Sequence, residues 1–496
     1  GASLLAYDTD MASLGYIIDK PLGLVRQIIV ERSDTVYDAN DPRYTSNINF
    51  DNTVSIDVTG HSLGGHLSAA FTRLFGHEAL TINGAGYPTG VLPGLGLEAT
   101  SNIANVFKAL GGESQFNSNS IHNLYGDRMP EFVTMDSVLG LVQQGSSDAV
   151  YIEQPTAFSH IMGHGADQMT DSLAVYDLFI HLDKSLQTLA PQQALEKLMP
   201  LFKAASADAT TSLETLVNAL ADLFHTGIRI DETETDNREA LYKAINAIKN
   251  SDLYKSAENV STILLTDQIE KSDYVDVAIN DNSKGEAYCY ALKHLNPFVV
   301  LSDSDIYAQH TTDHELDIYN PATGKGLTEQ WITDRAAMLY GLVEFNSKEL
   351  DISLPSGADI PPFSPSKAPD DWNFTDLSSN KPLTLLVKGN GGGFHHIKFG
   401  GFGENTLTGS GDSDHLYGME GSDVLTGNSG NDYLEGGSGL DTLNGGKGND
   451  TLMGGQGTDT YEFTGDFGND IILDSDGKGS IQIDGQTLSS ATKLAE

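Results

Sequence analysis

A nine-residue repeat near the C-terminus constrains the fold of this 496-residue chain more than any other feature. From Gly400 onward, glycine opens seven consecutive units that hold one register without an insertion. The eighth position of each unit is apolar: Leu407, Leu416, Leu425, Leu434, Leu443, Leu452 and Tyr461. A flexible glycine-rich linker would not keep leucine in phase. The repeat therefore predicts stacked turns that bury these side chains together, because one unit alone is too small to do so.

The sixth position of each unit predicts a metal ligand. It is filled by Asn405, Asp414, Asp423, Asp432, Asp441, Asp450 and Asp459. The pattern resembles the G-G-x-G-x-D-x-U-x repeat of calcium-binding parallel β-rolls, in which glycine carbonyls and aspartate carboxylates supply hard oxygen ligands. We therefore expect Ca²⁺ as the cofactor, bound by the six aspartates, with each ion shared by carboxylates two turns apart. Asn405 and the displaced Gly411 weaken the first pairs.

The charge of the chain limits its partners and compartment. The net charge is −41, so nucleic acid is excluded as a partner, and anionic membranes are poor partners without bridging cations. Eleven acidic residues and one lysine, Lys447, lie between Gly400 and Phe463. Without calcium these carboxylates repel one another, so we expect the segment to fold outside the cell. The single cysteine, Cys289, excludes an internal disulfide, and no apolar stretch predicts a membrane span.

A second motif predicts a catalytic nucleophile. Residues 60–64 read Gly-His-Ser-Leu-Gly and lie between a predicted strand at 53–59 and a predicted helix at 66–76. Strand, G-x-S-x-G and helix form the context of a nucleophile elbow, in which the serine hydroxyl stands exposed at a helix N-terminus. We predict that Ser62 is the nucleophile of a serine hydrolase and that the Leu63 N–H is an oxyanion donor. The alternative interpretation is an ordinary tight turn.

The nucleophile requires an acid that orients the catalytic base. In this fold the chain order is Ser, then Asp or Glu, then His, and the acid directly follows a strand. Asp127 meets both conditions, because it follows the predicted strand at 120–125. Asp136 and Asp148 are alternatives, and a turn aspartate without a catalytic role is the non-functional interpretation of Asp127.

Two histidines compete for the role of base. His164 lies on a glycine-flanked loop that leads into a predicted helix, which favours it over the nearby His160. His122 lies within a predicted strand and precedes Asp127, so it has the wrong order for the base.

These motifs divide the chain into five predicted parts of an α/β protein with a C-terminal roll. They are an α/β-hydrolase core at 1–184, a mostly helical extension at 185–352, a linker and lead-in at 353–399, a calcium-binding parallel β-roll at 400–463, and a roll cap or truncated C-terminal segment at 464–496. The pattern is helical from about 172 to 255.

The motifs together resemble those of a known family. Residues 60–65, residues 81–87 and the nonapeptides are similar to bacterial lipases that carry RTX repeats, related to family I.3, and the Gly-Asp-x-x-Pro turn at 126–130 resembles class 3 lipases. In such relatives a catalytic histidine precedes a helix similar to 169–176, which points to His164. The resemblance implies secretion by a type I system, contact with a lipid interface, and hydrolysis of triacylglycerol or phospholipid esters.

A departure from the family before the nucleophile motif keeps a second interpretation open. Only 61 residues precede Ser62, and none of them forms the Phe-Arg-Gly-Thr-like segment that donates the second oxyanion N–H. We therefore expect the chain to be a segment of a longer RTX protein. The alternative function is an RTX adhesion or binding segment with an inactive hydrolase-like domain. A zinc protease is excluded, because the sequence has no His-Glu-x-x-His.

Overall fold

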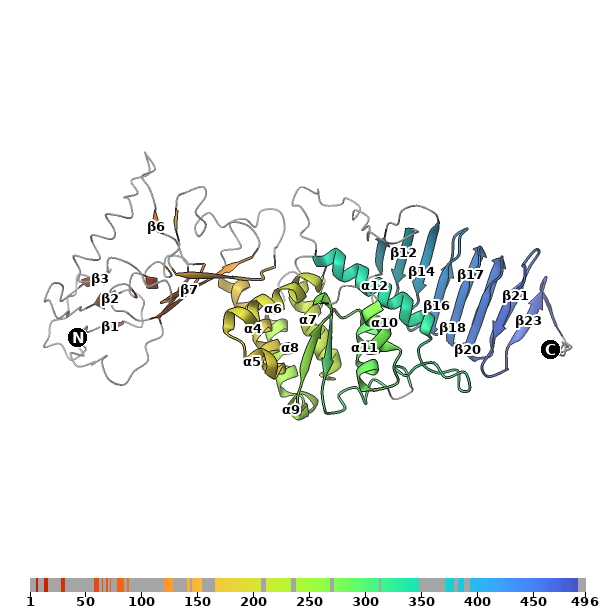
Figure 1. Ribbon diagram of the computed structural model, residues 1–496, viewed down its shortest axis with the longest axis horizontal. Helices are drawn as coiled ribbons and strands as arrows, with labels where there is room; N and C mark the ends of the chain where they lie inside the picture. The colour runs from red at the N-terminus through yellow and green to blue at the C-terminus, as the bar shows by residue number, and fades with distance from the viewer. Residues whose placement is uncertain are drawn as a thin grey trace. The chain divides into compact units, whose positions relative to one another are not determined.

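The structure, a computed structural model, divides into two compact units (Figure 1). Unit 1 comprises residues 1–177 and 189–199, and unit 2 comprises residues 178–188 and 200–496. The residues that the structure describes are 6–7, 13–16, 28–31, 58–61, 65, 68–69, 72, 78–83, 87–88, 120–127, 141–142, 145–153, 166–206, 211–232, 238–267, 272–311, 314–347, 371–378, 382–387 and 393–488.

A parallel sheet of four strands, in the order β4-β5-β7-β9, dominates unit 1. Its strands are β4 (Val58–His61), β5 (Ala79–Ile82), β7 (Ile121–Gly126) and β9 (Ser146–Val150). The strand predicted at 120–125 is thus confirmed as β7. Of the predicted strand at 53–59, residues 58 and 59 belong to β4, and residues 53–57 lie outside the described residues. Strand β4 continues through the first two residues of the pentapeptide 60–64.

Buried polar side chains link neighbouring strands of this sheet. The Thr81 hydroxyl donates to Asn123 Oδ1 at 2.5 Å, and Asn123 Nδ2 donates to the Ser146 carbonyl at 2.8 Å. Thr81 and Asn123 are almost fully buried, where an unpaired polar group is costly. A shift of register would break these bonds, so they favour the observed alignment of β5, β7 and β9 and of the strand ends.

Two smaller sheets complete the described strands of unit 1. They are the antiparallel sheet of β1 (Ala6–Tyr7), β2 (Ser13–Tyr16) and β3 (Ile28–Glu31), and the antiparallel pair of β6 (Tyr87–Pro88) and β8 (Leu141–Val142). Among the described residues of the predicted helix at 66–76, Ser68, Ala69 and Thr72 are helical and buried.

Helices predominate between residues 166 and 347. They are α4 (Ala166–Leu182), α5 (Lys184–Gln187), α6 (Pro191–Ala204), α7 (Ser212–Leu223), α8 (Arg238–Asn250), α9 (Asp252–Ser256), α10 (Ser272–Ala278), α11 (Ser283–His294) and α12 (Glu329–Ser347). The helical pattern predicted from 172 to 255 is confirmed by α4 to α9. Helices α4 and α6 each contribute residues to both units. The antiparallel strands β10 (Ser261–Leu264) and β11 (Phe298–Leu301) and the 3₁₀ helix η2 (Leu265–Asp267) belong to unit 2.

The repeats form a roll of two facing sheets, and successive turns contribute strands to alternate sheets (Figure 1). One sheet contains β13 (Leu383–Val387), β12 (Asp371–Asp376), β14 (Phe394–Phe399), β16 (His415–Glu420), β18 (Tyr433–Gly439), β20 (Thr451–Gly457) and β22 (Ile471–Leu473). The other contains β15 (Thr406–Thr408), β17 (Val424–Ser429), β19 (Thr442–Lys447), β21 (Thr460–Phe463), β23 (Ser480–Ile483) and β24 (Gln486–Thr487). Pairing is parallel except at β12–β13 and β23–β24.

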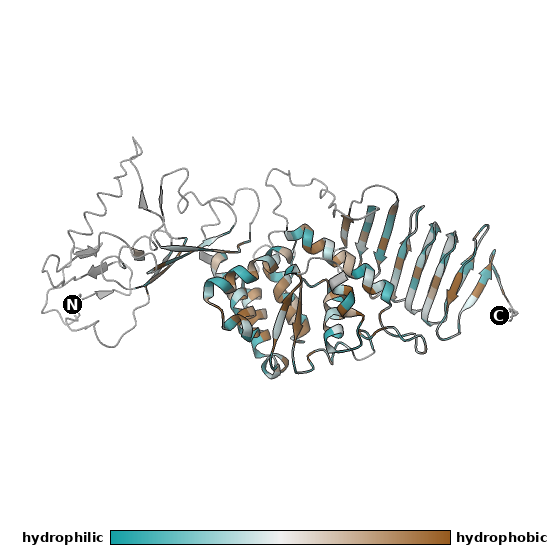
Figure 2. Cartoon of the chain, viewed as in Figure 1, coloured by the Kyte–Doolittle hydropathy of each residue, from teal (hydrophilic) through white to brown (hydrophobic). Residues whose placement is uncertain are grey.

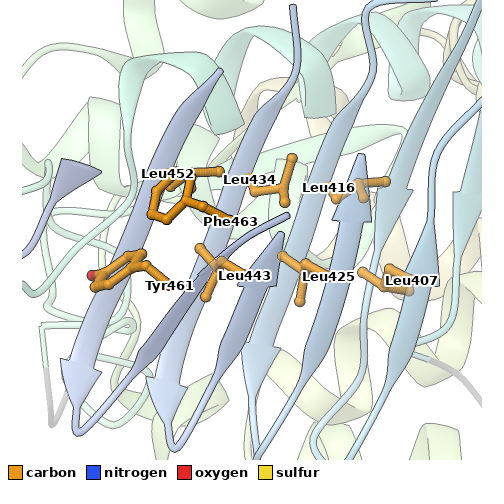
Figure 3. Close-up of a cluster of buried hydrophobic side chains, with 8 residues drawn as sticks. All are labelled: Leu407, Leu416, Leu425, Leu434, Leu443, Leu452, Tyr461 and Phe463. Atoms are coloured by element: carbon orange, nitrogen blue, oxygen red, sulfur yellow. The ribbon is translucent and has the colours of Figure 1, made fainter. Parts of the chain in front are cut away.

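The eighth-position side chains form the core of the roll, as the period predicts (Figure 3). Leu416, Leu434 and Leu452 stand in register on one sheet, and Leu425 and Leu443 are aligned on the other. All five are completely buried. Hydrophobic and hydrophilic segments follow one another along the strands of the roll (Figure 2), because alternate side chains face inward and outward.

The seven-stranded sheet extends beyond the seven units before the repeats, and both sheets extend beyond them after the repeats. Before the repeats, β12 pairs with β13 and β14, and β14 pairs with β16, so these three strands continue the sheet where we expected a linker and lead-in. After the repeats, β22 and β23 each extend one sheet within the predicted cap at 464–496. The proline-rich part of the predicted linker, 353–370, lies outside the described residues.

Helix α12 packs on the outward face of the seven-stranded sheet. Its Asp334 Oδ2 accepts the Tyr417 hydroxyl at 2.5 Å and lies 2.6 Å from His415 Nδ1. At the start of the helix, the Thr328 hydroxyl caps the backbone N–H of Trp331 and donates to Glu435 Oε2 at 2.8 Å. These contacts tie the helical part of unit 2 to β16 and β18.

Candidate functional site

The aspartates of the roll form two ladders of hydrogen bonds. The backbone N–H groups of four of them donate to the Oδ1 atom of the aspartate eighteen residues later, which is two turns along the roll. These bonds are Asp414 to Asp432 (2.8 Å), Asp423 to Asp441 (2.8 Å), Asp432 to Asp450 (2.9 Å) and Asp441 to Asp459 (3.0 Å). In each accepting aspartate, Oδ1 is therefore fixed by a backbone hydrogen bond, and Oδ2 takes no part in the ladder.

The second carboxylate oxygen has the environment of a cation ligand. The Oδ2 atoms of Asp423, Asp432, Asp441, Asp450 and Asp459 are buried and accept no hydrogen bond from any residue that the structure describes. A β-carbon at Gly427 would lie 2.2 Å from Asp432 Oδ2 and 2.5 Å from the Gly445 carbonyl oxygen. Two hydrogen-bond acceptors, the carboxylate oxygen and the carbonyl oxygen, thus lie close to the same glycine, and neither contact supplies a donor. Such a pair is stabilised by a bound cation, and only glycine leaves room for it.

Burial also affects protonation of these carboxylates. It raises the pKa of Asp423 to about 6 and the pKa of Asp432 and Asp441 to about 7, although a backbone N–H donated to each acts in the opposite direction. Without a metal ion, these buried groups therefore retain protons near neutral pH. A divalent cation would displace the protons and offset the cost of burying the charges.

The donor set fits calcium. It consists of carboxylate and carbonyl oxygens, which hard cations prefer, and it contains no sulfur or imidazole ligand. The part of the chain that the structure describes contains no cluster of three or more His, Cys, Asp or Glu side chains that would hold a metal ion. Backbone carbonyls must therefore complete the coordination.

The first two units of the roll differ from the others. Asp414 accepts hydrogen bonds from both the backbone N–H and the hydroxyl of Ser410, so its carboxylate is already satisfied. Asn405 Oδ1 accepts the Gly401 N–H at 2.7 Å and carries no charge. These contacts agree with the expectation that the first pairs bind calcium more weakly.

Of the predicted catalytic residues, the structure describes only Asp127. It directly follows β7, as expected, and its N–H donates to the Val150 carbonyl at 2.9 Å. Its Oδ1 accepts the Ile152 N–H at 3.2 Å, which fixes the carboxylate beside the end of β9. The alternative acid Asp148 lies within β9, opposite Leu124, and not after a strand.

The other predicted catalytic residues lie outside the described residues: Ser62, Leu63, His164, and the alternatives His160 and Asp136. In the sequence, Ser62 follows the last residue of β4, and His164 stands two residues before α4. His122 lies in β7 beside Ser146, as its predicted place in a strand requires.

Tyr176 is a neighbour of the candidate acid that we did not predict as a site residue. It lies on α4, and its hydroxyl accepts the Tyr151 N–H at 3.4 Å. Burial raises the pKa of Tyr176 far above its ordinary value, and the negative charge of Asp127 acts in the same direction. The hydroxyl therefore stays protonated at the end of β9. The sequence carries no local signal that Tyr176 lies near Asp127, since these two residues are 49 positions apart.

Comparison with known families identifies the roll. The RTX calcium-binding nonapeptide repeat family matches residues 399–434 and 426–461. The roll consists of RTX repeats. Such repeats bind calcium, so Ca²⁺ is the cofactor of the RTX roll, as its donor set indicates. No curated protein and no solved structure shows significant similarity to the chain.

The same match bears on the route of export. Proteins with RTX repeats are typically secreted by type I systems. Within the described residues, every helix is too short or too polar to cross a bilayer.

Proposed function

We propose that the chain is a secreted, calcium-dependent serine hydrolase that cleaves carboxylic esters of lipids with Ser62, His164 and Asp127. One observation carries the proposal. Strands β4 and β7 run parallel in one sheet, and they end immediately before Ser62 and Asp127 in the sequence.

The sheet geometry supports this pairing. The carboxyl ends of parallel strands lie at one edge, which is where ligands bind in α/β proteins. Only β5 separates β4 from β7, and neighbouring strands are about 4.8 Å apart, so the two ends lie roughly 10 Å from each other. An imidazole between a serine and an aspartate spans such a gap. The order Ser62, Asp127, His164 is also that of α/β-hydrolases.

The proposed residues have distinct roles in acyl transfer. His164 takes the proton from Ser62 as the serine oxygen attacks the ester carbonyl, and the Leu63 N–H donates to the oxyanion. Asp127 fixes the tautomer of the imidazole and stabilises its charged form. The alcohol leaves after accepting the proton from His164, and water then releases the acyl group from Ser62 by the same steps.

The RTX roll and the lipase resemblance support the remaining parts of the proposal. Calcium folds the roll, and type I export would deliver the enzyme to a calcium-rich exterior. The substrate class, triacylglycerol or phospholipid at a lipid interface, follows from the resemblance of residues 60–65 and 81–87 to RTX lipases.

Hydrolysis of p-nitrophenyl esters from acetyl to palmitoyl tests the proposal, in calcium and in chelator. We expect calcium-stimulated activity, which Ser62→Ala lowers by about 10⁶-fold and Asp127→Asn by about 10⁴-fold. Asp148→Asn is the matched control, since it removes one charge from the neighbouring strand and should leave activity unchanged. Triacylglycerol emulsions and phospholipid vesicles then separate the two substrate classes.

Absence of activity in the calcium-folded chain would overturn the proposal. The RTX adhesion or binding segment with an inactive hydrolase-like domain would then be the better interpretation. Loss of activity in Asp148→Asn but not in Asp127→Asn would reassign the acid.

A further inference from the structure

The aspartate ladder continues beyond the matched repeats, which end at residue 461. The N–H of Asp450 donates to Asp470 Oδ1 at 2.9 Å, although the spacing is twenty residues and not eighteen. Asp470 is not part of the seven-unit pattern, because two additional residues precede the turn that begins at Gly465.

The turn that ends at Asp470 shares its first glycine and its last three residues with two earlier turns. The triplet Gly-Asn-Asp occurs at 430–432, 448–450 and 468–470. Its asparagines form a ladder of their own, in which the Asn449 N–H donates to Asn431 Oδ1 at 2.9 Å and the Asn469 N–H donates to Asn449 Oδ1 at 3.0 Å.

The strands after these turns also pair in the same way. The Ile471 N–H donates to the Asp450 carbonyl at 2.8 Å, as the Thr451 N–H does to the Asp432 carbonyl. The loop from Gly465 to Asp470 is therefore an eighth turn of the array, shifted by two residues.

Asp450, whose N–H contacts this turn, has a carboxylate oxygen that lacks a ligand. Asp450 is 1% exposed, and its Oδ2 atom accepts no hydrogen bond from the described residues, like the Oδ2 atoms of Asp432 and Asp441. We propose that Asp450 and Asp470 share a further calcium ion outside the nonapeptide pattern. The sixth positions of the seven units form five pairs two turns apart, from Asn405 with Asp423 to Asp441 with Asp459, and this site brings the array to six.

The other face of the roll ends differently. There the position two turns after Asp459 is Gly479, which has no carboxylate. Asp474 instead accepts the Gly477 N–H at 2.8 Å and the Gly479 N–H at 3.0 Å, so both of its oxygens are satisfied within the turn. Hydrogen bonds close this last turn, and the extra site is confined to the side of Asp470.

Calcium stoichiometry tests the site. Asp470→Asn removes the charge but keeps an Oδ1 acceptor for the Asp450 N–H, and Asp466→Asn is the matched control, an exposed carboxylate in the same turn. Equilibrium dialysis at saturating calcium should show one ion fewer per chain in Asp470→Asn and no loss in Asp466→Asn. Equal stoichiometry of the wild type and Asp470→Asn would overturn the proposal.

Hydrogen exchange of the wild-type chain provides a second test that needs no variant. Binding at Asp470 should slow exchange of the amides at 466–473 by about a hundredfold when calcium is at 100 times its dissociation constant. If calcium protects the turns at 423–459 but leaves 466–473 unchanged, the extra site does not exist. Neither result depends on hydrolase activity.

Discussion

The side chain of Arg335 shows how a single charge is accommodated inside unit 2. Its guanidinium donates to Asp376 Oδ2 at 2.7 Å and to the carbonyls of Leu292 and Lys293 at 2.9 Å each, and it lies 4.6 Å from the centre of the Phe399 ring. The side chains of Arg335 and Asp376 are only 3% and 6% exposed. Burial lowers the pKa of Arg335, and the neighbouring carboxylate opposes this shift. The charge therefore depends on Asp376.

Removing that carboxylate should destabilise unit 2. We expect Asp376→Ala to lower the free energy of unfolding by about 3–5 kcal/mol, because it leaves the buried guanidinium unpaired. Chemical denaturation in saturating calcium measures the change. The double variant Arg335→Met/Asp376→Leu is the control, and it should recover most of the loss. A cost below about 1 kcal/mol for Asp376→Ala would contradict a buried pair.

Cys289 provides an independent residue-level test of the packing of α11. Its thiol donates to the Ala278 carbonyl at 3.4 Å, and burial raises its pKa to about 12, with Glu286 and Asp317 acting in the same direction. Because the thiolate is the reactive form, we expect Ellman's reagent to leave native protein unmodified at pH 8 and to label one thiol per chain in denaturant. Rapid labelling of native protein would show that this region is open.

At the scale of elements, the sequence predicts the repeating turns well because each turn carries its own signal. The leucine at the eighth position and the aspartate at the sixth lie in the core and on the ladder as expected. Strands β12 to β14 were not predicted, because their residues lack the glycine and aspartate pattern. Strand β14 pairs with β16, and β12 lies between β14 and β13. The nine-residue pattern did not identify Asp470, because two additional residues before its turn shift it out of register.

The candidate catalytic site was predictable only in part. Asp127 was placed correctly after its strand, since the alternation at 120–125 marks β7. The hydrogen bond from Ile152 and the proximity of Tyr176 depend on residues from β9 and α4, and no local pattern encodes such contacts. The assignments of Ser62 and His164 stay predictions.

The turns of the roll should respond to pH when calcium is absent. The pKa values of Asp432 and Asp441 are about 7 in the folded roll, against about 4 in an unfolded chain, so the folded form binds more protons between these limits. The stabilisation is fully present below about pH 4 and is lost as the pH rises through about 7. Calcium-free roll should therefore resist urea better at pH 5 than at pH 8.

Calcium affinity should change in the opposite direction, because the ion competes with these protons, so binding should strengthen from pH 5 to pH 8. Circular dichroism during urea and calcium titrations measures both trends. In Asp432→Asn/Asp441→Asn the pH dependence should be weaker, whereas Asp466→Asn should retain it. A pH dependence that both variants share equally would indicate a general effect of net charge.

On the scale of the whole molecule, folding of the roll and order of α12 should be coupled. Asp334 is buried against Tyr417 and His415, so loss of the roll exposes a carboxylate that the roll normally satisfies. We expect chelation of calcium to accelerate hydrogen exchange in α12 as well as in the roll. Helix α8, which packs against α7, is the internal control. Unchanged exchange in α12 would show that the helical part holds it alone.

The seam between α12 and the roll also solves a problem of alignment. A stack of similar turns offers a partner helix nearly equivalent positions about 4.8 Å apart, and nothing in the period itself chooses among them. A shift by one strand toward the C-terminus would set Asp334 against Glu435, one carboxylate facing another, and Thr328 against Met453. The outward residues at the seventh and ninth positions thus determine where α12 binds along an otherwise repetitive surface. One buried polar residue selects the alignment of a coiled coil in a similar way.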